Sequence, residues 1–200
     1  MLKTPTSIPI EGGDLFLFEN VLPPDKSAAT FNQLITDVDW QKETLFLFGR
    51  HIQVPRLTAW YGDAAYTYSG VRHEPRNWVS ILNALRDLVQ NKTNKPFNSV
   101  LLNHYRSGSD SMSWHSDNEP ELGLNPTIAS LSFGGTRRFR FRNTSDKKQT
   151  LSINLSDASL LVMAGPLQHN WQHTLPKTKK IVAPRINLTF RNIKTLGSTP

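Results

Sequence analysis

Apolar residues recur at helical spacing in two stretches of the first half of the chain. In residues 24–38, Phe31, Leu34 and Ile35 share one face. In residues 74–91, apolar side chains recur every three or four positions at Trp78, Ile81, Leu82, Leu85, Leu88 and Val89. This spacing predicts two amphipathic helices, each with one face buried.

Short strand-like runs separated by Gly, Pro, Asn and Asp clusters fill the second half. They cover residues 99–106, 127–133, 138–141, 150–155, 159–164, 171–175 and 185–191. Between the two helices, residues 43–48 and 51–54 predict a hairpin with its tip at 48–50. Strands at regular intervals behind two helices predict a mainly β fold, with the flanking helices packed on one outer sheet face. A double-stranded β-helix (jelly roll) is the natural candidate.

The 200 residues suit one structural domain with a sizeable core. Within it we expect a flexible N-terminus at 1–14 and a flexible tail at 194–200, since both are rich in Pro, Gly, Ser and Thr. Residues 15–98 would hold the helices and the hairpin, packed on the core, and residues 99–193 would form the β-helix core.

Composition narrows the classes of function. No apolar run approaches membrane-spanning length and no signal peptide is recognisable, so we expect an intracellular protein. The chain has no cysteine, so a transition metal must be held by nitrogen and oxygen ligands. The net charge of +7 and a pI near 9.8 favour polyanionic partners, nucleic acid first, although basic proteins without such partners are common.

His115 and Asp117 are the first candidates for metal binding. On a strand, residues two apart point to the same face, so both side chains converge on one ion. His173, in a later strand-like run, completes a set of two imidazoles and one carboxylate, which is typical of non-haem iron(II) oxygenases. A zinc hydrolase remains an alternative, His169 is an equal candidate for the distal ligand, and an isolated H-x-D is usually structural.

Two arginines follow on the last predicted strand, Arg185 and Arg191, six residues apart on one face. Guanidinium groups bind carboxylates in bidentate fashion, so this pair suits a dicarboxylate co-substrate. Asn187 and Thr189 share their face, while the opposite face is apolar. Such a polar face suits the lumen of a barrel and suits bulk solvent equally well.

Five motifs in order resemble the AlkB family of alkylation-repair dioxygenases. They are Asn103-His-Tyr-Arg, Trp114-His-Ser-Asp-Asn-Glu-Pro, Ile128-Ala-Ser-Leu-Ser-Phe-Gly-Gly-Thr-Arg, Trp171-Gln-His and Pro184-Arg-Ile-Asn-Leu-Thr-Phe-Arg. Pro55-Arg-Leu-Thr-Ala-Trp-Tyr-Gly-Asp and Tyr66-Thr-Tyr-Ser-Gly resemble the branch that holds the human DNA-repair homologues. The resemblance covers roughly residues 15–193.

The resemblance implies iron(II) as cofactor, with 2-oxoglutarate and O2 as co-substrates. It assigns the iron ligands to His115, Asp117 and His173. The 2-oxoglutarate pocket would be formed by Asn103, Tyr105, Arg185, Asn187 and Arg191. His104 points to the other face of its strand and is interpreted as structural.

The resemblance also assigns a nucleotide-recognition lid to the helices and hairpin. Tyr68, the second of the pair Tyr66 and Tyr68, would stack a flipped base against His115, although packing alone would also explain two tyrosines. Phe48 resembles a finger that fills the gap left by that base, unless it is buried. The remaining expected substrate contacts are Arg50 and Arg56 as phosphate ligands, Trp60, and Glu119 at the base edge. Arg137 and Arg138 are further phosphate candidates.

The implied reaction is oxidative demethylation of 1-methyladenine and 3-methylcytosine in DNA, with 2-oxoglutarate decarboxylation and release of formaldehyde. Methylated RNA is the alternative substrate. A nucleic-acid binding module with a vestigial metal site is the alternative from another class. We expect a monomer without a membrane partner, cytoplasmic if bacterial and nuclear if eukaryotic.

Overall fold

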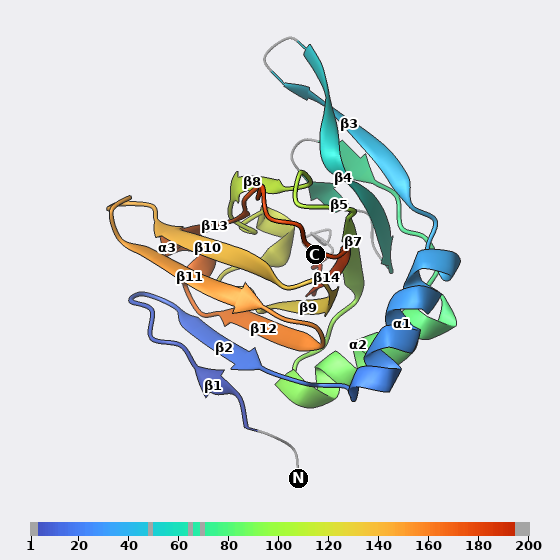
Figure 1. The fold of residues 1–200 in the computed structure, drawn as a ribbon. Coiled ribbons are helices and arrows are strands. Elements are labelled where there is room, and N and C mark those ends of the chain that lie inside the picture. Colours follow the sequence, from blue (N-terminus) through green and yellow to red (C-terminus); the bar gives the residue numbers. More distant parts are fainter. Residues whose placement is uncertain (1–3, 48–49, 64–65, 69–70, 195–200) are drawn as a thin grey trace, which may run out of the picture.

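Two antiparallel sheets form the body of the protein (Figure 1). The computed structural model describes residues 4–47, 50–63, 66–68 and 71–194, with the backbone alone at 45–47, 50–51, 66–68 and 71–73. The larger sheet has eight strands, in the order β1 (Thr6–Ser7), β2 (Asp14–Phe18), β12 (Ser159–Ala164), β9 (Ile128–Gly134), β14 (Arg185–Arg191), β7 (Ser99–Tyr105), β4 (Arg50–Gly62) and β3 (Gln41–Leu47). The smaller has four, in the order β11 (Thr150–Leu155), β10 (Arg137–Asn143), β13 (Trp171–Leu175) and β8 (Met112–His115).

This arrangement is a jelly roll, so the predicted fold class is confirmed. Strands far apart in the chain are neighbours, because β14 pairs with both β7 and β9. The last strand therefore lies in the middle of the larger sheet, and its seven residues are all buried. A separate two-stranded ribbon joins β5 (Tyr66–Tyr68) to β6 (Val71–His73).

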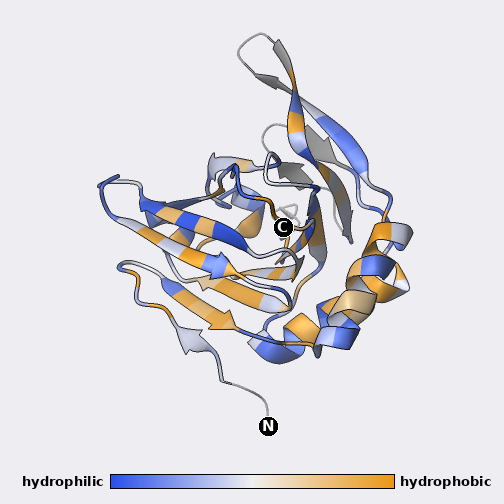
Figure 2. Cartoon of the chain, viewed as in Figure 1, coloured by the Kyte–Doolittle hydropathy of each residue, from blue (hydrophilic) through white to orange (hydrophobic). Residues whose placement is uncertain are grey.

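Large apolar side chains fill the space between the two sheets. They alternate with polar residues on β10, where orange and blue positions follow one another (Figure 2). Phe139 and Phe141 point inward from β10 with an edge-to-face contact at 5.2 Å between ring centroids. Leu101, Leu161 and Met163 meet them from the larger sheet. The period-two pattern thus decides which face of each strand is buried.

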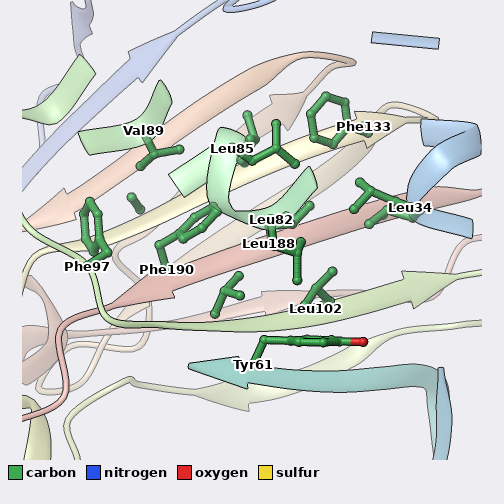
Figure 3. Close-up of a cluster of buried hydrophobic side chains, with 14 of the residues drawn as sticks. Leu34, Tyr61, Leu82, Leu85, Val89, Phe97, Leu102, Phe133, Leu188 and Phe190 are labelled. Carbon is green, nitrogen blue, oxygen red and sulfur yellow. The ribbon is translucent and has the colours of Figure 1, made fainter. Parts of the chain in front are cut away.

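Both predicted long helices cover the outer face of the larger sheet, as expected. They are α1 (Pro24–Asp37) and α2 (Ser80–Thr93). Their buried residues Leu34, Leu82, Leu85 and Val89 point toward the side chains of the sheet (Figure 3), among them Leu102, Phe133, Leu188 and Phe190. Each helix has 14 residues, and nowhere in the described chain is a helix long and apolar enough to cross a membrane.

The second helix begins later than its apolar spacing predicts. Arg76 lies alongside the end of β4 instead, where it forms a bridge with Tyr61 and its carbonyl accepts a hydrogen bond from the Gly62 N–H at 3.1 Å. The Arg76 carbonyl is thereby used by the sheet, and the helix starts at Ser80. It ends at Asn94, whose left-handed conformation (φ 51°) terminates the helix.

The predicted hairpin is present as β3 and β4, with Leu47 opposite Arg50. Its far part projects beyond the other strands of the larger sheet (Figure 1), and residues 48–49 at its tip lie outside the described residues. At its base, β4 pairs with β7. The larger sheet is therefore continuous across the division expected at 98/99, and residues 15–98 contribute strands to the core as well as packing on it.

The N-terminal segment also differs from the expectation of a loose tail. Thr6 and Ser7 pair with β2, which itself pairs with β12. The carbonyls of Glu11 and Gly12 accept hydrogen bonds from the side chains of Trp171 and Asn170, at 2.8 and 2.7 Å. Residues 4–14 are thus tied to the jelly roll, and the tail expected at 194–200 is described only at Lys194.

Candidate metal and co-substrate site

The three predicted metal ligands lie together between the sheets. His115 ends β8, and His173 lies opposite it on β13. Asp117 completes the group, in which the ligand atoms all lie within 4.8 Å of one another. The Nε2 atom of His115 is 4.0 Å from Asp117 Oδ1, and that of His173 is 3.9 Å from Asp117 Oδ2. This set of two nitrogens and one carboxylate suits a divalent transition metal and leaves coordination positions open.

Strand alternation does not account for the position of Asp117. The strand β8 ends at His115, so Asp117 lies two residues beyond it. Its backbone N–H donates to Oε1 of Gln168 at 3.0 Å, and Ser116 Oγ donates to the carbonyl of Trp171 at 3.0 Å. The aspartate is thus held by Gln168, and the preceding Ser116 by the first residue of β13. Sequence reasoning did not identify Gln168, because a single glutamine between two strands carries no periodic signal.

The geometry decides between the two candidates for the distal histidine. His169 is exposed on the short helix α3 (Leu167–Asn170), outside the cluster, whereas His173 is buried within it. The other imidazole is oriented by a hydrogen bond between His115 Nδ1 and the Ser113 carbonyl at 2.9 Å. Because a carbonyl only accepts, the Nδ1 of His115 carries the proton and its Nε2 lone pair faces the cluster.

Electrostatics keeps all three groups in the form that binds metal. Burial lowers the pKa of His173 to about 3, and it also lowers the pKa of His115, so both imidazoles are neutral. Burial alone would raise the pKa of Asp117, but the neighbouring Arg191 guanidinium brings it down to about 2. Arg191 Nη2 lies 2.8 Å from Asp117 Oδ1. Neutral imidazoles beside an ionised carboxylate are ready ligands.

Arg185 lies in the same cavity and lacks an acidic partner among the described side chains. Its Nη2 donates to Ser132 Oγ at 2.9 Å, while its Nε is buried without a hydrogen-bond partner in the part of the chain described. The side chain is 2% exposed, and burial lowers its pKa to about 10. A buried guanidinium without a counter-charge is costly. The site therefore fits a ligand that brings a carboxylate to Arg185.

The polar face of β14 lines this cavity, which settles the choice between lumen and solvent. Asn187 and Thr189 are buried between Arg185 and Arg191, and all four line the cavity. Asn187 Nδ2 donates to Ser130 Oγ at 2.7 Å, and its Oδ1 accepts from Thr189 at 3.1 Å. Asn187 thus lies where a co-substrate contact was expected, but most of its polar atoms already have partners.

Asn103 and Tyr105 enter the cavity from β7. Asn103 Oδ1 accepts a 2.6 Å hydrogen bond from Arg56 Nε. Since the oxygen is engaged, the Nδ2 donors of Asn103 face the other side. The Tyr105 ring has the Arg185 guanidinium 5.4 Å and the Arg137 guanidinium 5.9 Å from its centroid.

Arg56 and Arg137 are not placed to contact phosphate, contrary to expectation. Both are buried. Arg56 is bound to Asn103 and lies 3.4 Å from the Ser111 carbonyl. Arg137 donates to three backbone carbonyls, those of Ser107, Asp110 and Pro176. A basic side chain can neutralise buried carbonyls as well as phosphate, and sequence alone does not separate the two roles.

The other expected nucleotide contacts are only partly described. Tyr66 and Tyr68 lie on β5, but their side chains, like those of Phe48 and Arg50, are outside the described atoms. Trp60, expected as a substrate contact, is buried in the cluster between the sheets. Glu119 is half-buried and precedes the 3-10 turn Pro120–Leu122, close in sequence to Asp117.

A basic groove of about 530 Å³ adjoins this cavity. Arg137 lines the groove and also lies beside Tyr105, so the two spaces are neighbours. Arg138, Arg140, Lys177 and Lys180 add further positive charge, and no acidic side chain lines the described wall. Part of the net charge of +7 is thus concentrated in this groove.

Comparison with known proteins identifies the family. A family model described as the 2OG-Fe(II) oxygenase superfamily matches residues 14–191. The match spans the smaller sheet, every strand of the larger sheet except β1, both long helices and every residue that lines the cavity described above. The chain belongs to this superfamily.

Within the superfamily, the resemblance to AlkB proteins is confirmed. The chain is 43% identical over 174 residues to "Alpha-ketoglutarate-dependent dioxygenase alkB homolog 3" of Bos taurus, covering 82% of this chain and 61% of the relative. It is 42% identical over 156 residues to "DNA oxidative demethylase ALKBH2" of Homo sapiens, covering 74% of this chain and 60% of the relative. The chain thus spans about 60% of the length of these curated relatives.

A solved structure, "The structure of OsALKBH1", matches with a TM-score of 0.65 at 16% identity, covering 94% of this chain and all of the other. At 16% identity, this match supports the fold of the chain alone.

Proposed function

We propose that this chain is an iron(II)- and 2-oxoglutarate-dependent dioxygenase that removes alkyl groups from N-alkylated bases in DNA, such as 1-methyladenine and 3-methylcytosine. One observation carries the proposal: the buried Arg185 without an acidic partner, in the same described cavity as His115, Asp117 and His173. A zinc hydrolase would use the triad but would leave this guanidinium unexplained.

One group of residues would bind the metal and another would bind the co-substrate. His115, Asp117 and His173 would hold iron(II), and Arg185 would bind one carboxylate of 2-oxoglutarate as a fork of donors. Asn103 would add its Nδ2 donors, because Arg56 occupies its oxygen. Arg191 keeps Asp117 ionised despite its burial. Burial of these groups excludes water from the reacting centre.

Bound iron(II) supplies the activation of dioxygen. In the balanced reaction, 2-oxoglutarate, O2 and the cationic N-methylated base give succinate, carbon dioxide, formaldehyde, the neutral base and a proton. Decarboxylation provides two electrons and oxidation of the methyl group provides two more, which together reduce O2. The final step breaks the C–N bond of an N-hydroxymethyl base: the ring nitrogen keeps the electron pair of that bond, and the hydroxyl group loses its proton as formaldehyde forms.

Charge supports nucleic acid as the substrate. The basic groove offers Arg138, Lys177 and Lys180 to a phosphate backbone, and Arg140 Nε is buried without a partner in the described chain. Relatives named as DNA oxidative demethylases favour DNA. We further propose that Tyr68 stacks on the flipped base and that Phe48 probes the duplex. Tyr66 and Arg50 would make supporting contacts. We propose that the protein acts as a monomer.

The test is turnover on defined oligonucleotides. Purified protein with iron(II), 2-oxoglutarate and ascorbate receives 3-methylcytosine in single-stranded DNA, duplex DNA and RNA. We expect equal amounts of formaldehyde and repaired base from DNA. His115→Ala should abolish both products, whereas the matched His169→Ala, which changes an exposed histidine, should keep them. Binding without formaldehyde or succinate would favour a non-catalytic module, and turnover on RNA alone would overturn DNA as the substrate.

Duplex recognition has its own test in Phe48→Ala. If Phe48 fills the gap left by a flipped base, repair of duplex DNA should fall while repair of single-stranded DNA is retained. Equal losses on both substrates would contradict the finger.

A further inference from the structure

Gln168 is a buried side chain between the two segments that carry the metal ligands. It lies on α3, is 1% exposed, and accepts the backbone N–H of Asp117 through Oε1 at 3.0 Å. Five residues later the same segment reaches His173. Neither Gln168 nor α3 contributes a ligand atom to the cluster, so the contact with Asp117 acts through the backbone.

The hydrogen bonds fix the orientation of the Gln168 amide. A backbone N–H only donates, so the carbonyl oxygen of Gln168 must face Asp117. The Nε2 group then faces Met163 on β12, with Sδ at 3.7 Å. A thioether is a weak acceptor, so the orientation of the Gln168 side chain is determined mainly by its hydrogen bond with Asp117.

The segment that carries Gln168 is itself anchored on both sides. Asn170 Nδ2 donates to the Gly12 carbonyl, and Trp171 Nε1 donates to that of Glu11. On the other side the Thr144 N–H donates to the Asn170 carbonyl at 2.8 Å. A second link to the ligand loop runs from Ser116 Oγ to the Trp171 carbonyl. Gln168 therefore connects Asp117 to a segment that is hydrogen-bonded to the N-terminal residues and to Thr144.

We propose that Gln168 is a positioning residue of the metal centre, which sets metal affinity by fixing the backbone of Asp117 relative to His173. Without its oxygen, the buried Asp117 N–H loses its partner, and the backbone that carries the carboxylate is no longer fixed relative to the two imidazoles. Groups that orient ligands in this way typically contribute about 10- to 100-fold to metal affinity. The inference rests on the proposed function only in that the triad binds a divalent ion.

The test measures binding of cobalt(II) and manganese(II) to the metal-free full chain, without oxygen or nucleic acid. Gln168→Met keeps length and removes the acceptor oxygen. We expect cobalt(II) affinity about 10- to 100-fold lower, with an altered visible absorption spectrum of the bound ion. Gln168→Glu retains an acceptor oxygen at the same place and should bind more tightly than Gln168→Met.

Gln172→Met is the matched control. Gln172 precedes His173, but its Oε1 accepts from Arg142, away from the ligand cluster. We expect its metal affinity and cobalt(II) spectrum to equal those of the unchanged chain. Thermal unfolding of each metal-free variant separates loss of fold from loss of affinity.

Two results would overturn the proposal: a folded Gln168→Met with unchanged affinity and spectrum, or equal losses in Gln168→Met and Gln172→Met. If Gln168→Met does not fold, Gln168→Glu decides, because affinity as low as that of His115→Ala would contradict the positioning role. Failure of the proposed function looks different: the unchanged chain would bind cobalt(II) but release no formaldehyde from any substrate.

Discussion

Arg191 and Asp117, 74 positions apart in the chain, form an ion pair of 2.8 Å in which neither side chain is more than 2% exposed. Arg191 belongs to the central strand β14, whose polar face lines the co-substrate cavity. Asp117 belongs to the metal triad. The pair therefore joins the co-substrate cavity to the metal triad. The positive charge of Arg191 keeps the Asp117 carboxylate ionised, which is the form that binds a metal.

Arg191→Met should leave Asp117 buried without its permanent counter-charge. Breaking such a pair by removing one partner typically costs about 3–5 kcal/mol, and we expect that loss of unfolding free energy in urea for the metal-free protein. The pKa of Asp117 should rise, because Arg191 is the main group that lowers it. Arg138→Met, on the exposed face of β10, is the control and should stay within about 0.5 kcal/mol. Equal stability of the two variants would contradict the role of the pair.

Arg185→Met tests the co-substrate end of the site. Hydrogen bonds to charged groups contribute about 1.5–3 kcal/mol, so affinity for 2-oxoglutarate should fall about 10- to 100-fold. Cobalt(II) affinity should be retained, because Arg185 makes no contact with the triad in the described structure. The metal-free protein should lose little stability, since a buried guanidinium without an acid is replaced by an apolar chain. Binding of 2-oxoglutarate to the cobalt(II) protein without oxygen measures this, and unchanged affinity would remove Arg185 from the site.

Local pattern was sufficient to predict most of the fold. The strands β11, β12, β13 and β14 have the predicted bounds, because clusters of turn residues separate these short runs, which alternate on β14 and are continuously apolar on β12. The same alternation placed Arg185 and Arg191 on one face. It did not show whether that face is inside, since only the pairing of β14 between β7 and β9 buries it.

The parts that escaped prediction depend on partners distant in sequence. Arg56 was expected at a phosphate, yet its partner is Asn103, 47 residues away. Gln168 binds a backbone group 51 residues earlier, and a backbone group leaves no trace in the residue pattern. The strand β1 has two residues, too few for any periodicity. The roles of Arg56 and Gln168 therefore depend on long-range hydrogen bonds, which composition and residue spacing do not predict.

Asn103→Asp tests the inferred orientation of the Asn103 amide. Arg56 should keep the aspartate in place through an ion pair, but the donors toward the cavity are lost and a negative charge faces the dicarboxylate. We expect 2-oxoglutarate affinity to fall by at least about tenfold, which corresponds to 1.4 kcal/mol. Arg56→Met should have a smaller effect on affinity but should lower stability by about 1–3 kcal/mol, because the Asn103 oxygen is left buried without a donor.

Titration of 2-oxoglutarate into the cobalt(II) protein and urea unfolding provide the two measurements. Arg138→Met again serves as the control for loss of a positive charge. If Asn103→Asp binds 2-oxoglutarate as well as the unchanged chain, the amide oxygen and not the nitrogen faces the co-substrate.

His104 predicts a dependence of stability on pH that does not involve the metal ligands. Its ring lies against Trp40 at 5.3 Å between centroids, and its Nε2 is buried without a hydrogen-bond partner in the described chain. Burial lowers the pKa of His104 below its ordinary 6.5; Arg106 lowers it further and Asp110 opposes both. Below pH 6.5 the unfolded chain then binds the proton more readily, so the stability contributed by neutral His104 is lost as the pH falls.

His104→Leu removes this proton-binding site and fills the same space with an apolar side chain. We expect the variant to be at least as stable as the unchanged chain at pH 7.5, because a buried polar atom without a partner is removed. Its advantage should grow as the pH falls from 7.5 to 5.5. The free energy of unfolding of both metal-free proteins in urea, measured at both pH values, checks this. The histidines of the triad contribute equally to both chains and cancel in the difference, so a difference that is constant with pH would show that His104 keeps its ordinary pKa in the folded protein.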